Sequence, residues 1–327
     1  MSGASIRRLD DSLPYPSDLA GAVVAVGNFD GVHRGHQAVL AEARALAGRL
    51  GAPLVCLTFE PHPRTVFRPE QPVARLTPAR LKARLLDGLG FDAVVEWPFS
   101  RSFAALSPEA FVDGILVGHL GARGVVVGHD FHFGARRAGT PAFLREAATA
   151  RGFAVDVVEP LLDGAGHTVS SSRIRALLTA GDLGAANALL GWRWTTEGAV
   201  VHGAKLGRTL GYPTANLALQ PDDLLAHGIY AVKLRRADGS LHDGVASYGR
   251  RPTFDDGAAL LETFVFDFSG DLYGETVSVS LFARLRGEER FDSAEALVEQ
   301  MDRDSVDARA VLAEAAPLSE LDRATAF

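Results

Sequence analysis

The sequence predicts two domains: a doubly wound α/β domain, followed by a mainly antiparallel β-barrel that ends in a helix. Three observations support this fold class. A length of 327 residues fits two domains of ordinary size. In the first half, short apolar runs alternate with helical segments, as in βαβ units around a parallel sheet. In the second half, short strand-like runs are separated by turn residues, which is typical of an antiparallel barrel.

The α/β pattern occupies a first domain that we place at residues 1–186. Ligands of such sheets bind at the carboxyl ends of the strands, so we expect function where the first of these strands ends. The predicted strands are residues 22–26, 54–59, 92–95, 124–127 and 153–158, and the predicted helices are residues 37–50, 78–89, 108–120, 141–151 and 171–190.

The barrel pattern occupies residues 187–327. Its clearest strand-like runs are residues 228–234, 261–268 and 276–281, with a turn at residues 237–240 after the first of them. A helical pattern then runs to about residue 315, and Ser293 is expected to cap its start.

Composition and charge exclude several classes of protein. The net charge of -7 argues against a sequence-independent nucleic-acid binder, which would usually be basic. Cys56 is the only cysteine, which excludes an intrachain disulfide and a cysteine-built zinc site. No run approaches the ~18 to 20 apolar residues that span a bilayer. We therefore expect a cytoplasmic protein without nucleic-acid or membrane partners; the sequence leaves open whether it forms a homo-oligomer.

A glycine-rich segment with two histidines directly follows the first predicted strand. Residues 27–36 read Gly-Asn-Phe-Asp-Gly-Val-His-Arg-Gly-His. Gly31 and Gly35 allow a close backbone approach to a ligand, and the next helix presents unpaired N–H groups to an anion. His33 and His36 are three residues apart, so both rings can donate to one phosphate group and stabilise a leaving pyrophosphate. The alternative is a tight turn with two solvated histidines, which the flanking strand and helix disfavour.

This segment resembles the His-x-Gly-His signature of the α/β nucleotidyltransferases, and its full length is similar to that of the prokaryotic bifunctional riboflavin kinase/FAD synthetase family. Residues 58–63, 127–139 and 169–175 are similar to further family segments, in the same order. The resemblance implies a Rossmann-like domain that joins FMN to ATP, with His33 and His36 as catalytic residues. It implies ATP-binding roles for Gly27, Phe29, Gly35, Ser171, Ser172 and Arg175, and flavin-binding roles for Phe59, Pro61, His62, Asp130 and Phe131.

Each of these segments also has a purely structural interpretation. Phe59 and Pro61 could end a strand, Phe131 could be a core residue, and the serines at 170–172 could cap a helix. Capping is compatible with phosphate binding, because both use the helix N-terminus. The family usually has threonine at position 172, and serine keeps the hydroxyl. The order of the four segments favours the functional interpretation.

A second glycine-rich segment, residues 203–216, reads Gly-Ala-Lys-Leu-Gly-Arg-Thr-Leu-Gly-Tyr-Pro-Thr-Ala-Asn. Its glycines expose the backbone, and Lys205 and Arg208 add positive charge, which suits a phosphate chain. It lacks the spacing and the terminal Gly-Lys-Ser/Thr of a Walker A loop. Thr214 and Asn216 occupy alternate positions of an extended segment, so their oxygens project to one side and suit Mg²⁺ held jointly with ATP. The alternative is a basic surface hairpin.

This second segment resembles the Pro-Thr-Ala-Asn motif of riboflavin kinases, and residues 249–254 and 271–274 are also similar to that family. The resemblance implies phosphorylation of riboflavin, with ATP as co-substrate, Mg²⁺ on Thr214 and Asn216, and Glu262 as the base. Burying a glutamate in an apolar strand without purpose would be costly, although a glutamate at the rim could face solvent. The ATP-binding residues implied for this domain are Gly203, Lys205, Gly207, Arg208 and Gly211.

Two positions depart from the kinase pattern: Ser247 stands where asparagine is frequent, and Phe264 where histidine is common. Neither position holds the expected base or metal ligands. The expected partners are riboflavin, FMN, FAD and ATP. Two other functions stay open. One is a nucleotidyltransferase for another phosphorylated acceptor, with the barrel as a lone kinase or a relic. The other is a non-enzymatic flavin sensor, against which the intact His33, His36 and Glu262 argue.

Overall fold

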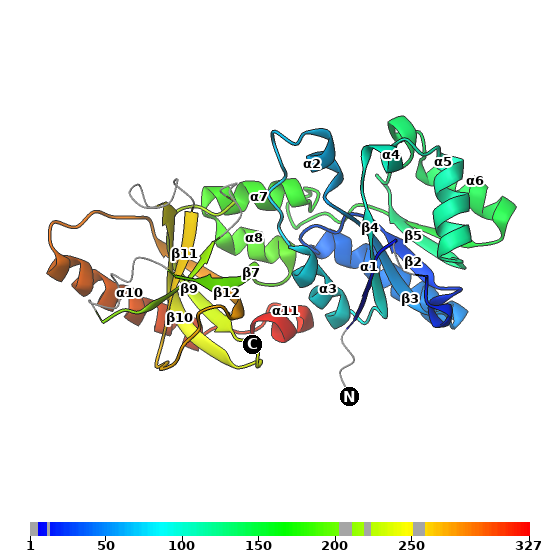
Figure 1. The fold of residues 1–327 in the computed structure, drawn as a ribbon. Helices are drawn as coiled ribbons and strands as arrows, with labels where there is room; N and C mark the ends of the chain where they lie inside the picture. The colour runs from blue at the N-terminus through cyan, green and yellow to red at the C-terminus, as the bar shows by residue number, and fades with distance from the viewer. Residues whose placement is uncertain (1–5, 12–13, 203–210, 219–223, 251–258) are drawn as a thin grey trace. The chain divides into compact units, whose positions relative to one another are not determined.

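The computed structural model describes residues 6–11, 14–202, 211–218, 224–250 and 259–327. The chain divides into two compact units (Figure 1). The first unit consists of residues 1–75 and 79–170, and the second of residues 76–78 and 171–327. The domain boundary that the sequence predicts, between residues 186 and 187, falls within the second unit and stays a prediction, because a compact unit and an activity domain need not end at the same residue.

The first unit is built on a six-stranded parallel sheet in the order β1-β4-β3-β2-β5-β6. β2 lies between β3 and β5, so the chain winds outward from β2 in both directions, and the predicted doubly wound fold is confirmed. The strands are β1 (Arg7–Leu9), β2 (Val23–Val26), β3 (Leu54–Glu60), β4 (Ala93–Pro98), β5 (Gly124–Gly128) and β6 (Ala154–Val158).

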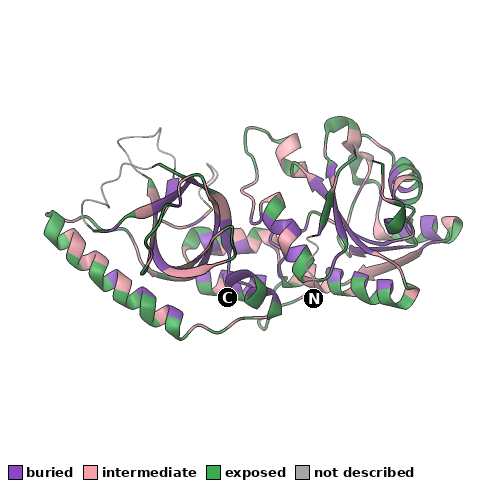
Figure 2. Cartoon of the chain, turned by 60° about the horizontal axis from the view of Figure 1, so that its bottom comes forward, coloured by how far each residue is buried: buried purple, intermediate pink, exposed green. Residues whose placement is uncertain are grey.

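Helices cover this sheet, and its central strands are buried (Figure 2). Every residue of β2 is buried, which is expected for a parallel strand covered on both faces. The helical segments are η1 (Ser17–Leu19), α1 (Arg34–Leu50), α2 (Pro63–Phe67), α3 (Ala79–Gly88), α4 (Arg101–Ala104), α5 (Pro108–Phe111), η2 (Val112–His119), η3 (Ala135–Arg137) and α6 (Pro141–Arg151).

The short helical segments η1, α2, α4 and η3 were not predicted, and η2 and β1 also differ from the sequence-based prediction. The predicted helix 108–120 begins as α5 but continues as the π-helical η2. A Cβ atom at Gly118 would lie 2.8 Å from the Asp113 carbonyl oxygen, so glycine accommodates this wider turn. The edge strand β1 was not predicted, because three residues beginning with two exposed arginines carry no apolar alternation.

The second unit is a closed barrel with strand order β10-β11-β8-β7-β12-β9, which confirms the predicted barrel. Its helices are α7 (Ser171–Ala180), α8 (Leu183–Leu190), α10 (Ala294–Ala313) and α11 (Glu320–Ala326). Its strands are β7 (Thr195–Val201), β8 (Thr214–Ala218), β9 (Gly228–Arg235), β10 (Leu241–Arg250), β11 (Ala259–Val265) and β12 (Thr276–Arg286).

The helix α10 packs along the outside of the barrel against β9, β10 and β12 (Figures 1 and 2). Its buried residues Asp304, Ala308 and Leu312 are spaced by four and share one face. The predicted cap is confirmed, because the Ala296 N–H donates to Ser293 Oγ at 3.1 Å. This helix closes one side of the pocket described below.

The predicted helix 171–190 is two helices. Gly181 has φ of +82° and ends α7, and Asp182 caps α8 by accepting a hydrogen bond from the Ala185 N–H at 3.0 Å. Strand β10 was not predicted, because its sequence mixes glycine and polar residues without alternation. Its pairing with β9 and β11 on its two sides defines it as a strand.

Two candidate active sites

The first candidate site is the histidine turn, residues 27–36, which links β2 to α1 at the point where the sheet winds in opposite directions. Ligands of open α/β sheets bind at this point. Gly31 has φ of +94°, which glycine adopts readily, but Phe29 and Val32 also have positive φ, at 45° and 38°. Positive φ is strained for a β-branched residue, and such strain concentrates at functional sites.

His33 and His36 lie against each other at the start of α1. Their rings stack with centroids 3.6 Å apart and planes 16° apart. His33 is 4% exposed and caps the helix, because its Nδ1 accepts a hydrogen bond from the His36 N–H at 3.2 Å. An accepting Nδ1 places the proton of a neutral ring on Nε2, so Nε2 is the donor nitrogen of the His33 ring. The structure thus brings the two predicted catalytic histidines together.

The other predicted residues of this turn support the histidines by packing. A Cβ atom at Gly35 would lie 3.2 Å from the His33 ring and 3.3 Å from the Val169 carbonyl oxygen, so only glycine fits without a shift. The Phe29 ring lies over Gly27 and meets the His36 ring edge-on at 5.4 Å. Phe29 is 2% exposed and forms the floor under His36. The proposed contacts of these residues with ATP stay a prediction.

The predicted flavin-side residues divide into core and surface positions. Phe59 is buried, with its ring 5.7 Å from Phe103, and Phe131 is half-buried and stacks on Phe133 at 5.3 Å. All four rings belong to one hydrophobic cluster. At the surface, His62 Nδ1 accepts a hydrogen bond from the Arg64 N–H at 3.2 Å, and Pro61 and Asp130 are exposed.

Ser171, Ser172 and Arg175 lie in the first turns of α7, in the second compact unit. Ser171 and Arg175 are half-buried, and Ser172 is exposed. The helix start is where serine hydroxyls and backbone N–H groups are available for a phosphate. Their assignment to ATP binding stays a prediction.

Beneath the histidine turn lies a cluster of charged residues that the motif analysis missed. The side chain of Lys82 is 1% exposed, and its Nζ donates to Glu60 Oε1 at 2.9 Å, Thr58 Oγ1 at 2.9 Å and the Asn28 carbonyl oxygen at 3.2 Å. One sequence signal could have revealed Lys82. It lies among Leu81, Leu85 and Leu86 on the apolar face of α3, where an unpaired cation is costly.

Arg75 completes this cluster. It donates to both carboxylate oxygens of Glu60, at 2.6 and 2.7 Å, and to Asp30 Oδ1 at 3.5 Å. Burial alone would raise the pKa of Glu60, but Arg75 and Lys82 outweigh that effect and lower it to about 2. Burial lowers the pKa of Lys82, and this effect outweighs the neighbouring Glu60 carboxylate, which raises it. We call Asp30, Glu60, Arg75 and Lys82 the charge cluster.

The low pKa of Glu60 predicts a loss of stability in acid. Its folded-state pKa of about 2 lies below the ordinary 4.5, so the stabilisation is complete above about pH 4.5 and is lost as the pH falls toward 2. A shift of this size corresponds to up to about 3 kcal/mol. We therefore expect wild type to be more stable than Glu60→Gln at pH 7 and this difference to shrink in acid. Urea unfolding at a series of pH values measures it, and a constant difference would contradict the expectation.

The second candidate site lies on three neighbouring strands of the barrel. On β8, β11 and β10, Asn216, Glu262 and Ser247 stand directly opposite one another, and Thr214, Phe264 and Val245 form the next such row on the same face. Residues two apart along a strand share a face, so both rows point the same way. The structure thereby places the predicted base beside both predicted metal ligands.

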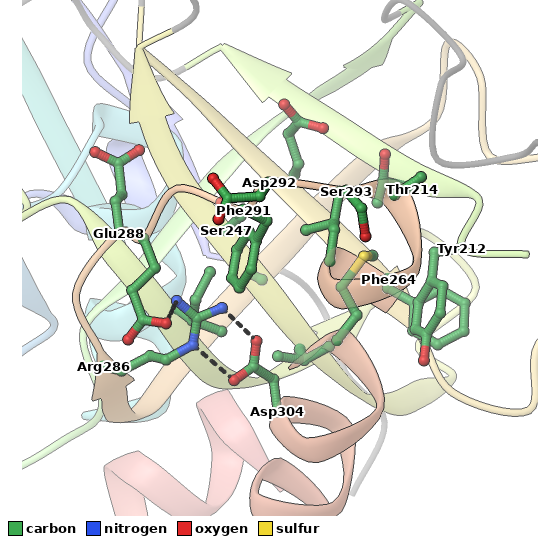
Figure 3. Close-up of a pocket in the computed structure, with 18 residues that line it drawn as sticks. Tyr212, Thr214, Ser247, Phe264, Arg286, Glu288, Phe291, Asp292, Ser293 and Asp304 are labelled. Atoms are coloured by element: carbon green, nitrogen blue, oxygen red, sulfur yellow. Dashed lines mark hydrogen bonds and ion pairs between the residues drawn. The ribbon is translucent and has the colours of Figure 1, made fainter. Parts of the chain in front are cut away.

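A pocket of about 730 Å³ opens on this face (Figure 3). Its volume is typical of small-molecule sites. Predicted residues Thr214 and Glu262 line it, as do both departures from the family pattern, Ser247 and Phe264. The other lining residues are Tyr212, Ile229, Val245, Ala246, Arg286, Glu288, Glu289, Phe291, Asp292, Ser293, Ala294, Leu297, Met301 and Asp304.

Asn216 is the residue whose contacts best fit a metal ligand. It is 4% exposed, and its Nδ2 donates to the Thr214 carbonyl oxygen at 3.2 Å. Within the described ranges, its buried Oδ1 has no hydrogen-bond partner. An amide oxygen of this kind suits Mg²⁺, which is usually held by few protein ligands together with phosphates. Among the described residues there is no cluster of three or more His, Cys, Asp or Glu that suits a metal.

The remaining predicted phosphate-binding residues of this site are only partly described. Gly211 lies within the described residues, with φ of +85°, and no heavy atom of the described residues lies within 4 Å of its would-be Cβ. Gly203, Lys205, Gly207 and Arg208 lie outside the described residues.

Two ion-paired side chains of the pocket wall had no sequence motif to reveal them. Arg286 donates to both carboxylate oxygens of Asp304 on α10, at 2.8 and 2.7 Å, and these bonds raise the pKa of Arg286. The pair joins the end of β12 to the helix across the pocket (Figure 3). Burial raises the pKa of Tyr212 to about 12, assisted by the hydrogen bond that its hydroxyl donates to the Asp302 carboxylate.

Known proteins match both halves of the chain. A family model described as FAD synthetase matches residues 15–173, and one described as riboflavin kinase matches residues 190–312. A bifunctional riboflavin kinase/FMN adenylyltransferase from Pseudomonas fluorescens is 44% identical over 90% of this chain and 94% of its own length. The chain belongs to this bifunctional family. The predicted boundary at 186/187 falls in the gap between the two matched regions.

A second relative carries the same name, and a solved structure with a different description shares the fold. The bifunctional riboflavin kinase/FMN adenylyltransferase of Listeria monocytogenes is 41% identical over 89% of this chain and 92% of its own length. A solved structure described as a macrolide-efflux protein from Streptococcus pneumoniae is 32% identical, with a TM-score of 0.81 over 93% of this chain and 99% of that chain. In the part of the chain that the structure describes, no helix is both long and apolar enough to cross a membrane.

Proposed function

We propose that this member of the bifunctional family converts riboflavin to FMN at the Glu262 pocket of its barrel unit and FMN to FAD at the histidine turn of its α/β unit, using ATP in both steps. The observation that carries the proposal is that the two stacked histidines and the Glu262 pocket are each assembled from residues of a single unit. Two separate centres suit two successive reactions.

For adenylylation, an FMN phosphate oxygen attacks the α-phosphorus of ATP, and the bond to the β-phosphate breaks to release pyrophosphate. The work of the protein is positioning and stabilisation of negative charge. The N–H groups of His33 and His36 donate to phosphate oxygens as charge develops on the leaving group. Ser171, Ser172 and Arg175 are assigned to the ATP phosphates. Gly27, Phe29 and Gly35 shape the ATP side, and Phe59, Pro61, His62, Asp130 and Phe131 shape the flavin side.

For phosphorylation, the ribityl 5'-hydroxyl oxygen of riboflavin attacks the γ-phosphorus of ATP, and ADP leaves. Glu262 accepts the hydroxyl proton, and the aromatic side chains of the pocket hold the flavin. Thr214 and Asn216 would hold Mg²⁺, which neutralises phosphate charge when it is bound. Gly203, Lys205, Gly207, Arg208 and Gly211 are assigned to the ATP phosphates of this unit.

One incubation tests the whole proposal. Purified protein with riboflavin and Mg·ATP should accumulate FMN and then FAD, separated by chromatography. Supplied FMN with ATP should give FAD and pyrophosphate. A parallel screen of other phosphorylated acceptors with labelled ATP distinguishes a nucleotidyltransferase of different specificity. Flavin binding without turnover would instead indicate a sensor and overturn the proposal.

A fragment that begins near Leu190 is expected to fold alone and to phosphorylate riboflavin, because the barrel has its own core. A longer fragment from Ser171 should be more stable. It keeps Asn187, whose Nδ2 donates to the Leu281 carbonyl oxygen at 3.1 Å and whose Oδ1 accepts from the Trp194 N–H at 2.8 Å. Thermal unfolding and kinase assays of both fragments make the comparison. A folded but inactive fragment from Leu190 would contradict the expectation, and inactivity of the folded fragment from Ser171 as well would show that the kinase needs residues from before Ser171.

A further inference from the structure

The charge cluster occupies the space between two segments to which the proposed function assigns substrates. Glu60 ends β3, immediately before the flavin-side residues Pro61 and His62, and Asp30 lies within the histidine turn. The cluster holds two cations and two carboxylates, so its formal charge is balanced. All four side chains are largely buried, with exposed fractions of 1% for Lys82, 2% for Asp30, 12% for Arg75 and 22% for Glu60.

Lys82 is the member of this cluster that contacts the backbone of the histidine turn. An ammonium has three N–H donors, and the three acceptors of Lys82 use all of them. The Asn28 carbonyl oxygen accepts from Lys82 and also from Thr58 Oγ1, at 3.1 Å. The buried Lys82 head group therefore has no N–H left for a substrate, and any effect on catalysis has to pass through the groups that it holds.

The turn needs such support because its backbone is strained. Phe29, with φ of 45°, lies directly between Asn28, whose carbonyl Lys82 holds, and Asp30, whose carboxylate Arg75 holds. Strained residues persist where their surroundings over-determine them. Phe29 is also the floor under the His36 ring, so a shift at Asn28 reaches the histidines through a single packed side chain.

We propose that Lys82 is a positioning residue for adenylylation: through the Asn28 carbonyl and Glu60 it fixes the histidine turn relative to the segment after β3. This inference rests on the proposed function of the α/β unit. Misplacing catalytic groups by about 1 Å can cost roughly 100-fold in rate, so the effect on turnover should be large even though Lys82 does not contact substrate.

The test compares Lys82→Met with wild type in the full-length protein, using supplied FMN and Mg·ATP. Methionine keeps the length of the side chain and removes its charge and donors. Per folded molecule, kcat for FAD formation should fall roughly 100-fold, with little change in KM for ATP or FMN. Riboflavin phosphorylation by the same sample should be retained. A near wild-type kcat would overturn the inference.

A second variant separates positioning from the mere burial of a charge. Lys82→Met leaves Glu60 short of one partner, and the double variant Lys82→Met/Glu60→Gln restores charge balance with Arg75 and Asp30. The double variant should recover thermal stability but not kcat. Recovery of kcat as well would show that Lys82 only neutralises Glu60, which would overturn the inference. If Lys82→Met alone does not fold, kcat of the double variant decides.

A matched control is available in the barrel. Lys233 has a side chain that is 13% exposed, and its Nζ pairs with Asp243 Oδ1 at 2.6 Å. Lys233→Met should leave FAD formation from FMN unchanged. The wild-type assay distinguishes a failure of the proposed function from a failure of the inference about Lys82. No FAD from wild type would overturn the proposed function together with this inference, whereas an active wild type with an equally active Lys82→Met counts against Lys82 alone.

Discussion

His36→Ala is expected to abolish FAD formation while riboflavin is still converted to FMN. The His36 ring stacks on His33 at 3.6 Å, and both begin the helix that faces the proposed phosphate site. Removing one donor to developing phosphate charge typically lowers kcat by on the order of 100-fold or more. In a chromatographic assay starting from riboflavin, the variant should accumulate FMN and stop there.

A control variant and a test of folding show whether the loss is due to the His36 side chain itself. His167 is exposed, and its hydrogen bonds with Asp163 use the His167 backbone, so His167→Ala should form FAD like wild type. Circular dichroism of His36→Ala should match wild type, because the His33 side chain caps α1 through a backbone N–H that alanine keeps. Loss of both activities in a folded His36→Ala protein would refute the assignment of two separate sites.

Most of the architecture could be predicted from the sequence because its strands and helices have clear apolar patterns. Strands such as β2 and β3 are almost wholly apolar, as parallel strands buried on both faces must be. Among the strands that the sequence-based prediction missed are β1 and β10, because neither has apolar alternation, and pairing with neighbouring strands defines them instead. The break between α7 and α8 depends on one left-handed residue, Gly181, inside an otherwise continuous helical pattern.

Motifs identified residues that are close in sequence, and they could not identify those that only the fold brings together. His33 and His36 lie in one string, whereas Lys82 contacts Asn28 and Glu60 from a helix that carries no motif. Arg286 and Asp304 likewise meet across the pocket from β12 and α10. The one general signal for residues of this kind is a charged side chain on the apolar face of a helix. A buried charge needs a partner of opposite charge, but the sequence does not show which residue that partner is.

The two departures from the kinase pattern, Phe264 and Ser247, lie on the same pocket wall. Phe264 and Ser247 both line the pocket with Glu262, and the Phe264 ring lies 4.7 Å from that of Tyr212. Phenylalanine at this position therefore makes the wall next to the expected base aromatic and apolar. An apolar wall suits the ring system of a flavin, while the neighbouring row of Asn216, Glu262 and Ser247 supplies the polar groups.

Glu262→Gln is expected to lower kcat for riboflavin phosphorylation by roughly 10²- to 10⁴-fold, the usual contribution of a general base. Glutamine keeps the size and shape of the side chain in β11 and removes the proton acceptor. Flavin and ATP affinities should change little, because the amide still forms hydrogen bonds. Adenylylation of supplied FMN should be unaffected, because His33 and His36 belong to the other unit.

The barrel offers a matched control for Glu262→Gln. Glu197 lies on β7, its Oε1 accepts a hydrogen bond from Ser278 Oγ at 2.9 Å, and it is not among the residues that line the pocket. Glu197→Gln keeps that acceptor and should phosphorylate riboflavin at close to the wild-type rate. A Glu262→Gln protein that did the same would refute the assignment of the base. Attention would then move to the other carboxylates that line the pocket, those of Glu288, Glu289 and Asp292.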